Sequence, residues 1–446
     1  MKAPTPMNAL SIDTEYARFG AARLLSGTRA DVAARLGPLT YGEIDAPASP
    51  GPDWVTVQPR MSGICGSDLT TVTGRSSRWF EQIVSFPFVP GHEVVADDPE
   101  GRRVVLEPVL GCATRGIEPP CAACADGRLG NCEHLTHGCL EPGLQSGFCC
   151  DTGGGWSEQM VAHPSQLHVV PDELDDRAAV LVEPTACAVH AALSASVGRD
   201  DTVAVIGAGT LGLTTIAALS RWSPAGRLVV AAKHPHQRRL AAELGTVDGV
   251  APTVCEPGSL LRTVRRVVGT SFVGDGTSVH DRLSGGVDVT IDCVGSSDSL
   301  AAATAMTRPG GRVVLVGMPV PQHLDLTALW QRELSLQGVY AYGTETVGGS
   351  RVRTFDLAFE LVAAQDLGRL VSASYPLERY ADAIAHASEA GRRGATKVVF
   401  DLRDPDHPAA PVLRAGRPGT TRPTRSTRPG RAHRAAPGID SKDPER

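Results

Sequence analysis

The sequence VAVIGAGTLG, residues 203–212, decides which fold this chain adopts. Its three glycines form a G-x-G-x-x-G run directly after an apolar stretch, and an Ala- and Leu-rich helical stretch follows. Glycines at these positions permit a tight turn, a close approach of the backbone to a pyrophosphate, and close packing of a helix on a strand. The N-terminus of that helix would face the phosphates. The residues predicted to hold a dinucleotide here are Gly207, Gly209, Thr210, Leu211 and Gly212.

Beyond this stretch, short apolar segments alternate with helical ones. RLVVAAK (227–233) and VDVTIDCVG (287–295) read as strands, whereas QRRLAAELG (237–245) and SLAAATAM (299–306) read as helices. Such alternation is typical of a parallel sheet wound with helices. The strand, the turn and the helix therefore lie where a dinucleotide site requires them.

The regions before and after this alternation predict a domain that the dinucleotide-binding domain interrupts. Short apolar runs broken by Gly and Pro, such as DWVTVQPRMSGI (53–64), indicate a strand-rich N-terminal region. Two helical stretches and a closing strand, ATKVVFDL (395–402), follow the alternating part. We therefore predict a β-rich catalytic domain, a wound dinucleotide-binding domain, a return to the first domain and a disordered basic tail, over residues 1–185, 186–342, 343–402 and 403–446.

Composition and charge limit the classes of protein to which this chain can belong. The chain has 446 residues and a net charge of -6, yet residues 403–446 hold ten Lys or Arg against five Asp or Glu. Nucleic acid is not the expected partner of this tail, because no aromatic residue is present to stack on a base. No apolar run approaches the roughly 20 residues that a membrane-spanning helix needs, and no secretion signal precedes residue 20. We therefore expect a cytoplasmic protein, in which the 11 cysteines stay reduced and their clusters suggest metal sites.

The choice of dinucleotide follows from the second strand of the wound sheet. An NAD-preferring site usually places an Asp or Glu about 20 residues after the glycines, where it binds the ribose hydroxyls. The sequence has no acid there, and Lys233, His234 and Arg238 stand where an acid would repel a 2′-phosphate. These residues favour NADP over NAD, although they also suit an ordinary solvated helix start.

Three further segments carry candidate metal ligands. GICGSDL (63–69) holds Cys65, FVPGHEVV (88–95) holds His92 and Glu93, and LVEPTACAVH (181–190) holds Glu183. A single cysteine is more often a small buried hydrophobe than a ligand. Sulfur, imidazole and carboxylate together, however, match the mixed donors that Zn²⁺ accepts.

These motifs, in this order before the dinucleotide glycines, resemble those of the zinc-dependent medium-chain dehydrogenase/reductase family over residues 7–402. The resemblance implies an α/β fold, with a GroES-like β-rich catalytic domain interrupted by a Rossmann doubly wound parallel-sheet domain. It makes Cys65, His92 and Glu183 the catalytic zinc ligands, with Glu93 able to join or exchange. Ser67 matches the hydroxyl that binds the substrate oxygen, and Asp68 matches the carboxylate that orients the histidine. Thr70 stands where many members have the histidine that ends a proton relay, and Glu183 resembles the polyol and threonine dehydrogenase branch.

The segment GCATRGIEPPCAACADGRLGNC (111–132) resembles the structural zinc lobe of this family, which uses four cysteines spaced C-x2-C-x2-C-x7-C. Cys121, Cys124 and Cys132 match the last three positions. The first ligand is then either Cys112, with an insertion after it, or Glu118. We prefer Cys112, because EPVLGC resembles the family's approach to its first cysteine.

The predicted reaction is the reversible, NAD(P)-linked oxidation of an alcohol, of a secondary, polyol or sugar type, by a zinc enzyme. The resemblance also places Val294, Gly295, Val316 and Gly317 beside the cofactor. It implies one catalytic and one structural zinc, and a homodimer or homotetramer. Two alternatives stay open: a zinc-free quinone or enoyl reductase of the same superfamily, and a zinc-stabilised binding protein without catalysis.

Overall fold

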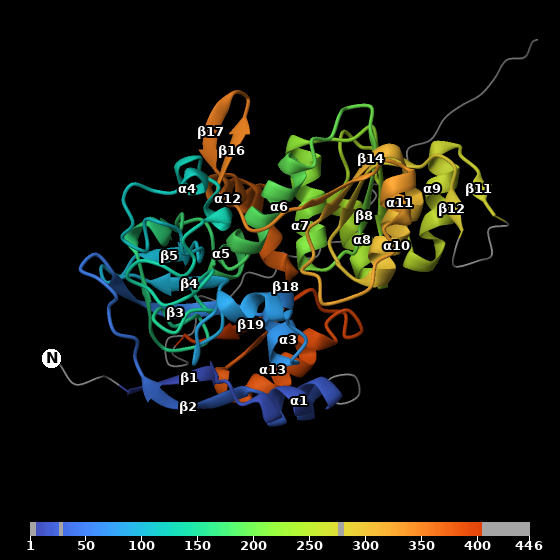
Figure 1. Cartoon of the computed structure of the whole chain (residues 1–446). Helices are drawn as coiled ribbons and strands as arrows, with labels where there is room; N and C mark the ends of the chain where they lie inside the picture. Colours follow the sequence, from blue (N-terminus) through green and yellow to red (C-terminus); the bar gives the residue numbers. More distant parts are fainter. Residues whose placement is uncertain (1–5, 26–29, 275–280, 404–446) are drawn as a thin grey trace, which may run out of the picture. The chain divides into compact units, whose positions relative to one another are not determined.

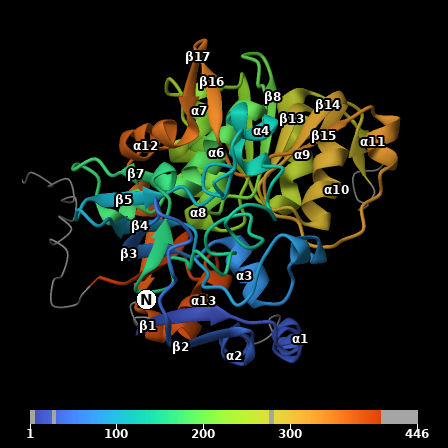
Figure 2. The same ribbon diagram turned by 60° about the vertical axis from the view of Figure 1, so that its left-hand side comes forward.

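The structure, a computed structural model, describes residues 6–25, 30–274 and 281–403 (Figures 1 and 2). The basic tail predicted from residue 403 onward lies outside the described residues, apart from Arg403 itself. None of the helices in the described part is both long and apolar enough to cross a membrane.

The wound sheet predicted from the glycine motif has six strands, all parallel (Figure 1). Starting from the strand that precedes the glycines, the next two strands of this sheet lie on one side of it and the last three lie on the other side. The strand order therefore reverses between that first strand and its neighbour on the second side. Such a reversal leaves a crevice at the carboxyl ends of the two strands, where open α/β sheets bind their ligands. In spatial order the strands are β10 (Thr253–Cys255), β9 (Arg227–Ala231), β8 (Thr202–Ile206), β13 (Val287–Asp292), β14 (Thr307–Leu315) and β15 (Ser335–Gly338).

Successive side chains of a strand point to opposite sides of the sheet, and in this sheet both sides are apolar. Helices therefore cover both of its faces. Val203 and Val205 of β8 belong to the core cluster that α7 (Thr210–Trp222) covers. Ala204 and Ile206 belong to a second cluster, on the other face. The remaining helices of this half are α8 (Pro235–Leu244), η4 (Pro257–Ser259), α9 (Leu260–Val268), α10 (Ser297–Met306) and α11 (Thr327–Gln331).

The second sheet has seven strands and combines the two ends of the described chain. Its central strand β3 pairs antiparallel with β4 on one side and with the C-terminal strand β19 on the other. The segment after the wound sheet thus returns to the N-terminal half, as Figure 1 shows for β18 and β19. The strands are β18 (Val371–Tyr375), β19 (Lys397–Asp401), β3 (Val55–Gly63), β4 (Val94–Asp97), β5 (Arg103–Leu106) and β7 (Leu167–Val169), with β6 (Met160–Ala162) paired to β3.

Short helices and three two-stranded hairpins complete the described chain. The hairpins are β1 (Pro6–Ile12) with β2 (Leu39–Asp45), β11 (Phe272–Val273) with β12 (Arg282–Leu283), and β16 (Thr344–Val347) with β17 (Ser350–Arg353). The helices before the wound sheet are α1 (Tyr16–Leu25), α2 (Ala30–Leu36), α3 (Gly66–Val72), η1 (Arg78–Gln82), α4 (Ala122–Ala125), η2 (Leu129–Asn131), η3 (Pro164–Gln166), α5 (Asp176–Ala179) and α6 (Val182–Ser194). Those after it are α12 (Thr354–Ala364), η5 (Leu367–Leu370), η6 (Leu377–Arg379) and α13 (Tyr380–Ser388).

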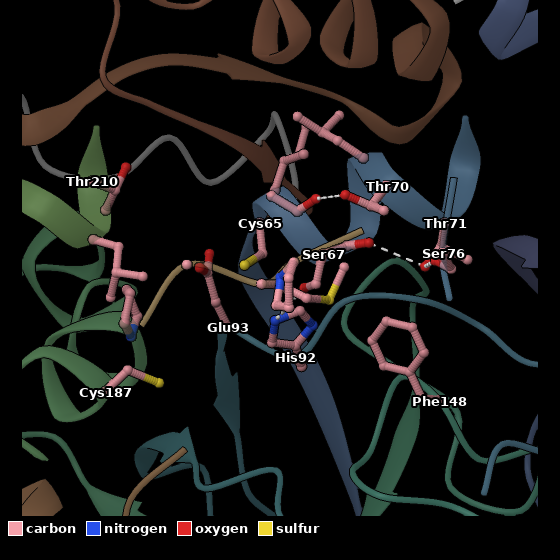
Figure 3. A pocket seen from close by; sticks show the side chains of 18 of the residues that line it. Cys65, Ser67, Thr70, Thr71, Ser76, His92, Glu93, Phe148, Cys187 and Thr210 are labelled. Atoms are coloured by element: carbon pink, nitrogen blue, oxygen red, sulfur yellow. Dashed lines mark hydrogen bonds between the residues drawn. The ribbon is translucent and has the colours of Figure 1, made fainter. Parts of the chain in front are cut away.

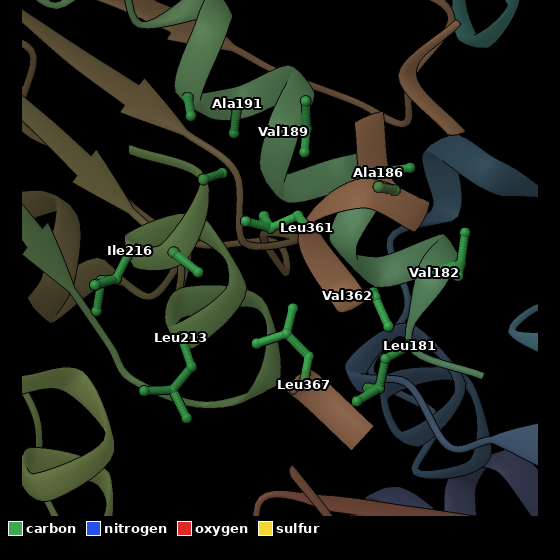
Figure 4. Packing of buried hydrophobic residues seen from close by; sticks show 14 of the residues in the cluster. Leu181, Val182, Ala186, Val189, Ala191, Leu213, Ile216, Leu361, Val362 and Leu367 are labelled. Atoms are coloured by element: carbon green, nitrogen blue, oxygen red, sulfur yellow. The ribbon is translucent and has the colours of Figure 1, made fainter. Parts of the chain in front are cut away.

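The largest core cluster joins α6 to α7 and α12 (Figure 4). Val189 on α6, Leu213 on α7 and Leu361 on α12 are all fully buried in it. The domain boundary predicted at residue 185 falls inside α6, so this helix spans the predicted junction. Because Glu183 stands in the first turn of α6, the packing of this helix also fixes the position of one candidate metal ligand.

Candidate active site

A cavity of about 1110 Å³ brings the separate sequence motifs together. Its wall includes Cys65, Ser67 and His92 from the N-terminal half and the glycine turn before α7 from the wound sheet. Figure 3 shows Cys65, His92 and Glu93 directed toward one another in this cavity. The motifs thus meet at a shared space although they lie far apart in the sequence.

Asp68 fixes both the start of α3 and the histidine beside it. Its carboxylate accepts the backbone N–H of Cys65 at 2.9 Å, which caps the helix. Its other oxygen lies 3.4 Å from His92 Nδ1, and the Asp68 side chain is fully buried. A histidine that binds a metal usually donates its other ring N–H to such a carboxylate. Asp68 itself does not line the cavity, so it acts on the site through His92 and the backbone of Cys65.

The second ring nitrogen of His92 faces the cavity. His92 Nε2 lies 3.5 Å from the hydroxyl oxygen of Ser67. Burial lowers the pKa of His92, but the neighbouring Asp68 and Cys65 outweigh this effect and raise the pKa well above its ordinary value. The surroundings therefore favour positive charge at this point, which suits a cation in place of the proton.

Cys65, His92 and Glu93 form one potential metal-binding group. Their sulfur, nitrogen and oxygen ligand atoms all lie within 4.8 Å of one another. This donor set fits Zn²⁺, which accepts thiolate, imidazole and carboxylate ligands. The cavity on one side of the group leaves room for a further ligand, as a catalytic zinc site requires.

Glu93 is also paired with a lysine that the sequence did not single out. Lys397 Nζ forms an ion pair with the Glu93 carboxylate, and each side chain is only 2% exposed. Lys397 also donates to the backbone oxygen of Ile64 at 3.2 Å. A side chain at Gly63 would collide with this pair, which explains the glycine there. The available signal was a charged residue opening the apolar stretch KVVF, in a strand that returns to the interior of a sheet.

Glu183 lies in the same cavity but outside the group of three. Its carboxylate accepts the hydroxyl proton of Tyr342 at 3.0 Å, and Cys187 Sγ lies 3.8 Å from it. Burial and the nearby Glu93 raise the pKa of Glu183 to about 7, while His92 and the Tyr342 hydroxyl oppose this rise. Neither Tyr342 nor Cys187 was identified from the sequence. The position of Cys187 one helical turn after Glu183 was the available signal for that residue.

The second predicted metal group is the four-cysteine lobe, made of Cys112, Cys121, Cys124 and Cys132. Its four sulfur atoms lie within 4.8 Å of one another, and Glu118 is not in this group. Backbone N–H groups donate to three of the sulfurs at 3.3 to 3.5 Å. Burial opposes ionisation of Cys121, but backbone N–H donors together with the Cys124 and Cys112 side chains outweigh it and lower its pKa to about 6. Four thiolates in this arrangement fit a closed, structural zinc site.

Arg115 stabilises the insertion that follows Cys112. The guanidinium is 1% exposed and donates only to backbone oxygens, among them His137 at 3.0 Å, Leu140 at 3.2 Å and Gly143 at 2.6 Å. The segment that it holds continues into Leu144, which lines the cavity. Arg115 therefore links the four-cysteine lobe to the wall of the candidate active site.

The dinucleotide crevice has the geometry that its glycines predict. Gly207 has a φ of +94°, and a side chain there would approach Val294 to 2.6 Å. A side chain at Gly212 would collide with the backbone oxygen of Gly207. A side chain at Gly209 would meet no atom within 4 Å, so this position borders open space beside the N-terminus of α7. Room for a ligand at a helix N-terminus fits the pyrophosphate of a dinucleotide.

The predicted cofactor residues divide into two groups. Those that line the cavity are Gly209, Thr210, Leu211, Gly212, Val294, Val316 and Gly317. Those that do not line it are Gly207, Gly295, Lys233, His234 and Arg238. Asp292, which the sequence did not single out, accepts the backbone N–H of Val294 at 2.9 Å and that of Gly295 at 3.2 Å. This buried carboxylate holds the loop after β13 against the crevice.

The basic residues after β9 lie close to one another. Burial lowers the pKa of His234, and the positive charges of His236, Lys233, Arg392 and Arg238 lower it further. Arg238 donates to the backbone oxygen of Lys233 at 3.0 Å and pairs with Glu256 at 3.2 Å. Its guanidinium therefore already has partners, in contrast to the open cation that the sequence suggested.

The wound sheet carries a glycine turn for a dinucleotide, and the β-rich half brings cysteine, histidine and glutamate to the same cavity. These two features together define the class of nucleotide-dependent zinc dehydrogenases. Comparison with family models agrees: the alcohol dehydrogenase GroES-like domain matches residues 51–172, and the zinc-binding dehydrogenase model matches residues 210–364. The chain belongs to the zinc-dependent medium-chain dehydrogenase family, and it is an NAD(P)-linked alcohol dehydrogenase. The predicted family, fold class and enzyme class are confirmed.

Individual relatives support the same assignment. A sorbitol dehydrogenase of Arabidopsis thaliana is 28% identical over 370 residues, which cover 79% of this chain and 90% of that protein. An L-idonate 5-dehydrogenase of Vitis vinifera is 28% identical over 368 residues, covering 79% and 89%. The crystal structure of 2R,3R-butanediol dehydrogenase from Bacillus subtilis has a TM-score of 0.61 and 20% identity, covering 89% of this chain and 100% of that one, which establishes the shared fold.

Proposed function

We propose that this chain reversibly oxidises a secondary alcohol to a ketone at the group formed by Cys65, His92, Glu93 and Glu183. The observation that carries the proposal is the shared cavity, which the soft and hard donor atoms border together with the glycine turn of the wound sheet. An alcohol at the donor atoms and a nicotinamide held by the turn would therefore share one enclosed space. Proximity of this kind supplies a large part of the rate enhancement in two-substrate reactions.

The metal ligands in this proposal are Cys65, His92 and Glu183, with Glu93 as an exchanging fourth donor. A bound zinc would act as a Lewis acid that lowers the pKa of the alcohol, and a bound nicotinamide would accept hydride from its carbon. Asp68 holds the His92 ring through Nδ1, so Nε2 stays directed at the cavity. The ion pair with Lys397 holds the Glu93 carboxylate beside the other donors.

Ser67 is the first acceptor of the alcohol proton in this scheme. Its hydroxyl borders the cavity 3.5 Å from His92 Nε2, next to the donor atoms. Thr70 follows one helical turn later and also lines the cavity, but its hydroxyl donates to the backbone oxygen of Gly66 at 2.8 Å. Passage of the proton beyond Ser67 therefore requires rotation of the Thr70 hydroxyl or a water molecule.

We infer that the four-cysteine lobe holds a second zinc, so the loaded protein contains two zinc ions per chain. Its all-sulfur donor set and its N–H donors support a structural role. A zinc-free reductase of the same superfamily would have no use for Cys65, His92 and Glu183 at one cavity. Metal analysis of the purified protein separates the two cases: we expect about two zinc per chain, and a catalytically active chain without zinc would contradict the proposal.

We infer a preference for NADP over NAD from the basic group after β9. Lys233, His234, His236 and Arg392 gather there, and Glu256 is engaged with Arg238. The expected result is a higher kcat/KM with NADP, which Lys233→Ala reduces by roughly tenfold because one phosphate contact is lost. Arg239→Ala is the matched control, since Arg239 belongs to the same helix but is directed to Glu243. Equal kcat/KM values for the two cofactors would contradict this preference.

The names of the relatives make polyols and sugar-derived alcohols the first substrate class to test. Sorbitol, L-idonate and D-xylulose are the compounds in those names. The decisive experiment is a panel of alcohols with both cofactors, followed by the absorbance of the reduced nicotinamide. Reduction of either cofactor by a secondary alcohol supports the proposal, and none across the panel would overturn it. We expect the active species to be a homodimer or homotetramer, which light scattering measures.

A further inference from the structure

One wall of the cavity comes from a helical excursion near the N-terminus. β1 and β2 pair in continuous register from Pro6 with Asp45 to Ile12 with Leu39, so the chain between Ile12 and Leu39 leaves the hairpin and returns to it. This excursion contains α1 and α2 and lies outside both segments matched by the family models. The cavity is nevertheless lined by Tyr16 and Phe19 of α1. The N-terminal helix α1 thus forms part of the active-site wall.

The excursion packs on the end of α3 that is remote from the metal ligands. Cys65 immediately precedes α3, whereas a side chain at Gly74, just after the helix, would lie 2.6 Å from the backbone oxygen of Phe19. The seven residues of α3 span about 10 Å. α2 packs against α13, and the segment that follows α13 also lines the cavity. α1 is therefore held in place at the end of α3 that lies away from Cys65.

A series of aromatic rings leads from the metal ligands toward this wall. The ring centroids of His92 and Phe148 are 5.8 Å apart, those of Phe148 and Phe88 are 5.3 Å apart, and those of Phe88 and Phe86 are 5.1 Å apart. Phe80 lines the same cavity, as do the aliphatic side chains of Val84 and Leu144. Figure 3 shows Phe148 beside His92. This side of the cavity offers rings and aliphatic groups to a substrate.

Two hydroxyl groups on the facing helix already donate their protons to the backbone. Thr70 donates to the backbone oxygen of Gly66 at 2.8 Å, and Thr71 donates to that of Ser67 at 3.0 Å. Thr71 also lies 3.0 Å from the Ser76 hydroxyl. At the exposed mouth, Arg78 and Glu81 pair with each other at 3.0 Å. A polyol chain has a hydroxyl on every carbon, and each one buried without a partner costs free energy.

We propose that the substrate of this site is an alcohol with an apolar alkyl or aryl group at the end remote from the reacting hydroxyl. The hydroxyl end lies at Ser67 and the metal ligands, and the apolar end lies between Phe80, Phe86 and α1, where Tyr16 and Phe19 contact it. This inference rests on the proposed function and narrows its substrate class.

The test measures kcat/KM for 2-alkanols from 2-butanol to 2-octanol, with sorbitol and xylitol in the same panel. Each added methylene that enters the apolar end should raise kcat/KM about three- to fourfold, since burial of a methylene contributes to binding in proportion to its area. The polyols should fall below the longer alkanols. A flat series, or a preference for sorbitol or xylitol, would overturn this inference while leaving the proposed alcohol oxidation intact. Failure of every alcohol would instead overturn the proposed function.

Two variants locate the effect in the structure. Phe80→Ala and Tyr16→Ala should each flatten the dependence of kcat/KM on chain length, because both side chains line the apolar end. Tyr16 is 82% exposed, so its replacement leaves the core packing unchanged. Trp79→Ala is the matched control: Trp79 precedes Phe80 in η1, is 79% exposed and does not line the cavity. An unchanged slope in both cavity variants, or an equal loss in Trp79→Ala, would contradict the assignment of this wall.

Discussion

The two potential metal-binding groups of this protein differ in what surrounds their donor atoms. The four-cysteine lobe gathers its ligands within one segment, between Cys112 and Cys132, and surrounds them with backbone N–H donors. The cavity group takes Cys65, His92 and Glu93 from separate loops, and it is neighboured by Glu183 from α6 and Lys397 from β19. One group is a closed local loop, and the other depends on four distant parts of the chain.

This difference implies that the four-cysteine lobe contributes to folding and that the cavity group carries the reaction. A closed all-sulfur group has no position for a substrate, so a metal there holds the loop together. The cavity group combines charged side chains in a buried space that a substrate also enters, so its charges must be balanced by Lys397 and by hydrogen bonds. Loss of a ligand should therefore unfold the first region and inactivate the second.

The largest effect is expected in the lobe. Cys124→Ser should remove one zinc per chain and locally unfold residues 112–135, because structural zinc contributes on the order of 10 kcal/mol to the folding of small zinc domains. Hydrogen exchange over this segment and zinc analysis measure the effect. Cys139→Ser is the control, since Cys139 is exposed and lies outside the four-sulfur group. Unchanged protection of the segment in Cys124→Ser would show that it folds without metal.

The cavity group should respond in activity rather than in folding. His92→Ala should lower kcat by about three to four orders of magnitude, because the Lewis acid that activates the alcohol is lost. The midpoint of urea unfolding should fall less than in Cys124→Ser, because the lobe keeps its zinc and only the buried contact between His92 and Asp68 is lost. Cys255→Ala, a change at a buried cysteine outside both groups, is the control for activity. Retention of activity by His92→Ala would break the comparison between the two regions.

The ion pair of Lys397 with Glu93 sharpens the comparison further. Lys397→Met should lower the free energy of unfolding by about 3 to 5 kcal/mol, because it leaves a carboxylate buried without its partner. Glu93→Gln in the same chain should recover most of that loss, and urea unfolding of the single and double variants measures the coupling. If the losses of the two single variants simply add, the pair is not a coupled unit.

A smaller effect concerns the pH dependence of the metal-depleted protein. Burial raises the pKa of Glu183 from 4.5 to about 7, so the folded state holds its proton more tightly than the unfolded state does. This stabilisation is fully present below pH 4.5 and is lost as the pH rises through 7, a decrease of about 3 kcal/mol in the free energy of unfolding. Glu183→Gln should remove this decrease, as urea unfolding between pH 5 and pH 8 would show. The same pH dependence in both proteins would contradict the assignment to Glu183.

Residues whose roles depend on local spacing were predictable. The glycines of the wound sheet, the four cysteines of the lobe and the order of the Cys65, His92 and Glu183 motifs all stand in the sequence at fixed intervals. Lys397 and Tyr342 were not predictable in the same way, because each reaches its carboxylate from a remote strand or loop. Their spacing from their partners, more than 150 residues, carries no periodic signal.

The basic residues after β9 show a second reason why a site cannot be fully predicted from the sequence. Their charge and their place after the second strand were visible in the sequence, and in the structure they lie close enough together for their charges to lower the pKa of His234. The sequence could not show that the Arg238 guanidinium pairs with Glu256 and donates to two backbone oxygens. Hydrogen-bond partners are a matter of three-dimensional distance, so a charged residue alone does not reveal whether it is free.

The sequence by itself determined the wound sheet, the interrupted N-terminal domain and the residue types for two metal groups, since backbone geometry and donor chemistry act over a few residues. Tertiary structure decided that Glu93 joins the group of Cys65 and His92 while Glu183 borders the same cavity, that Lys397 pairs with Glu93, and that α1 supplies one wall. These features arise from the pairing of β19 with β3 and from the packing of α1 on the end of α3. Contacts between distant segments are selected by the free energy of the whole fold, which no local stretch of sequence contains.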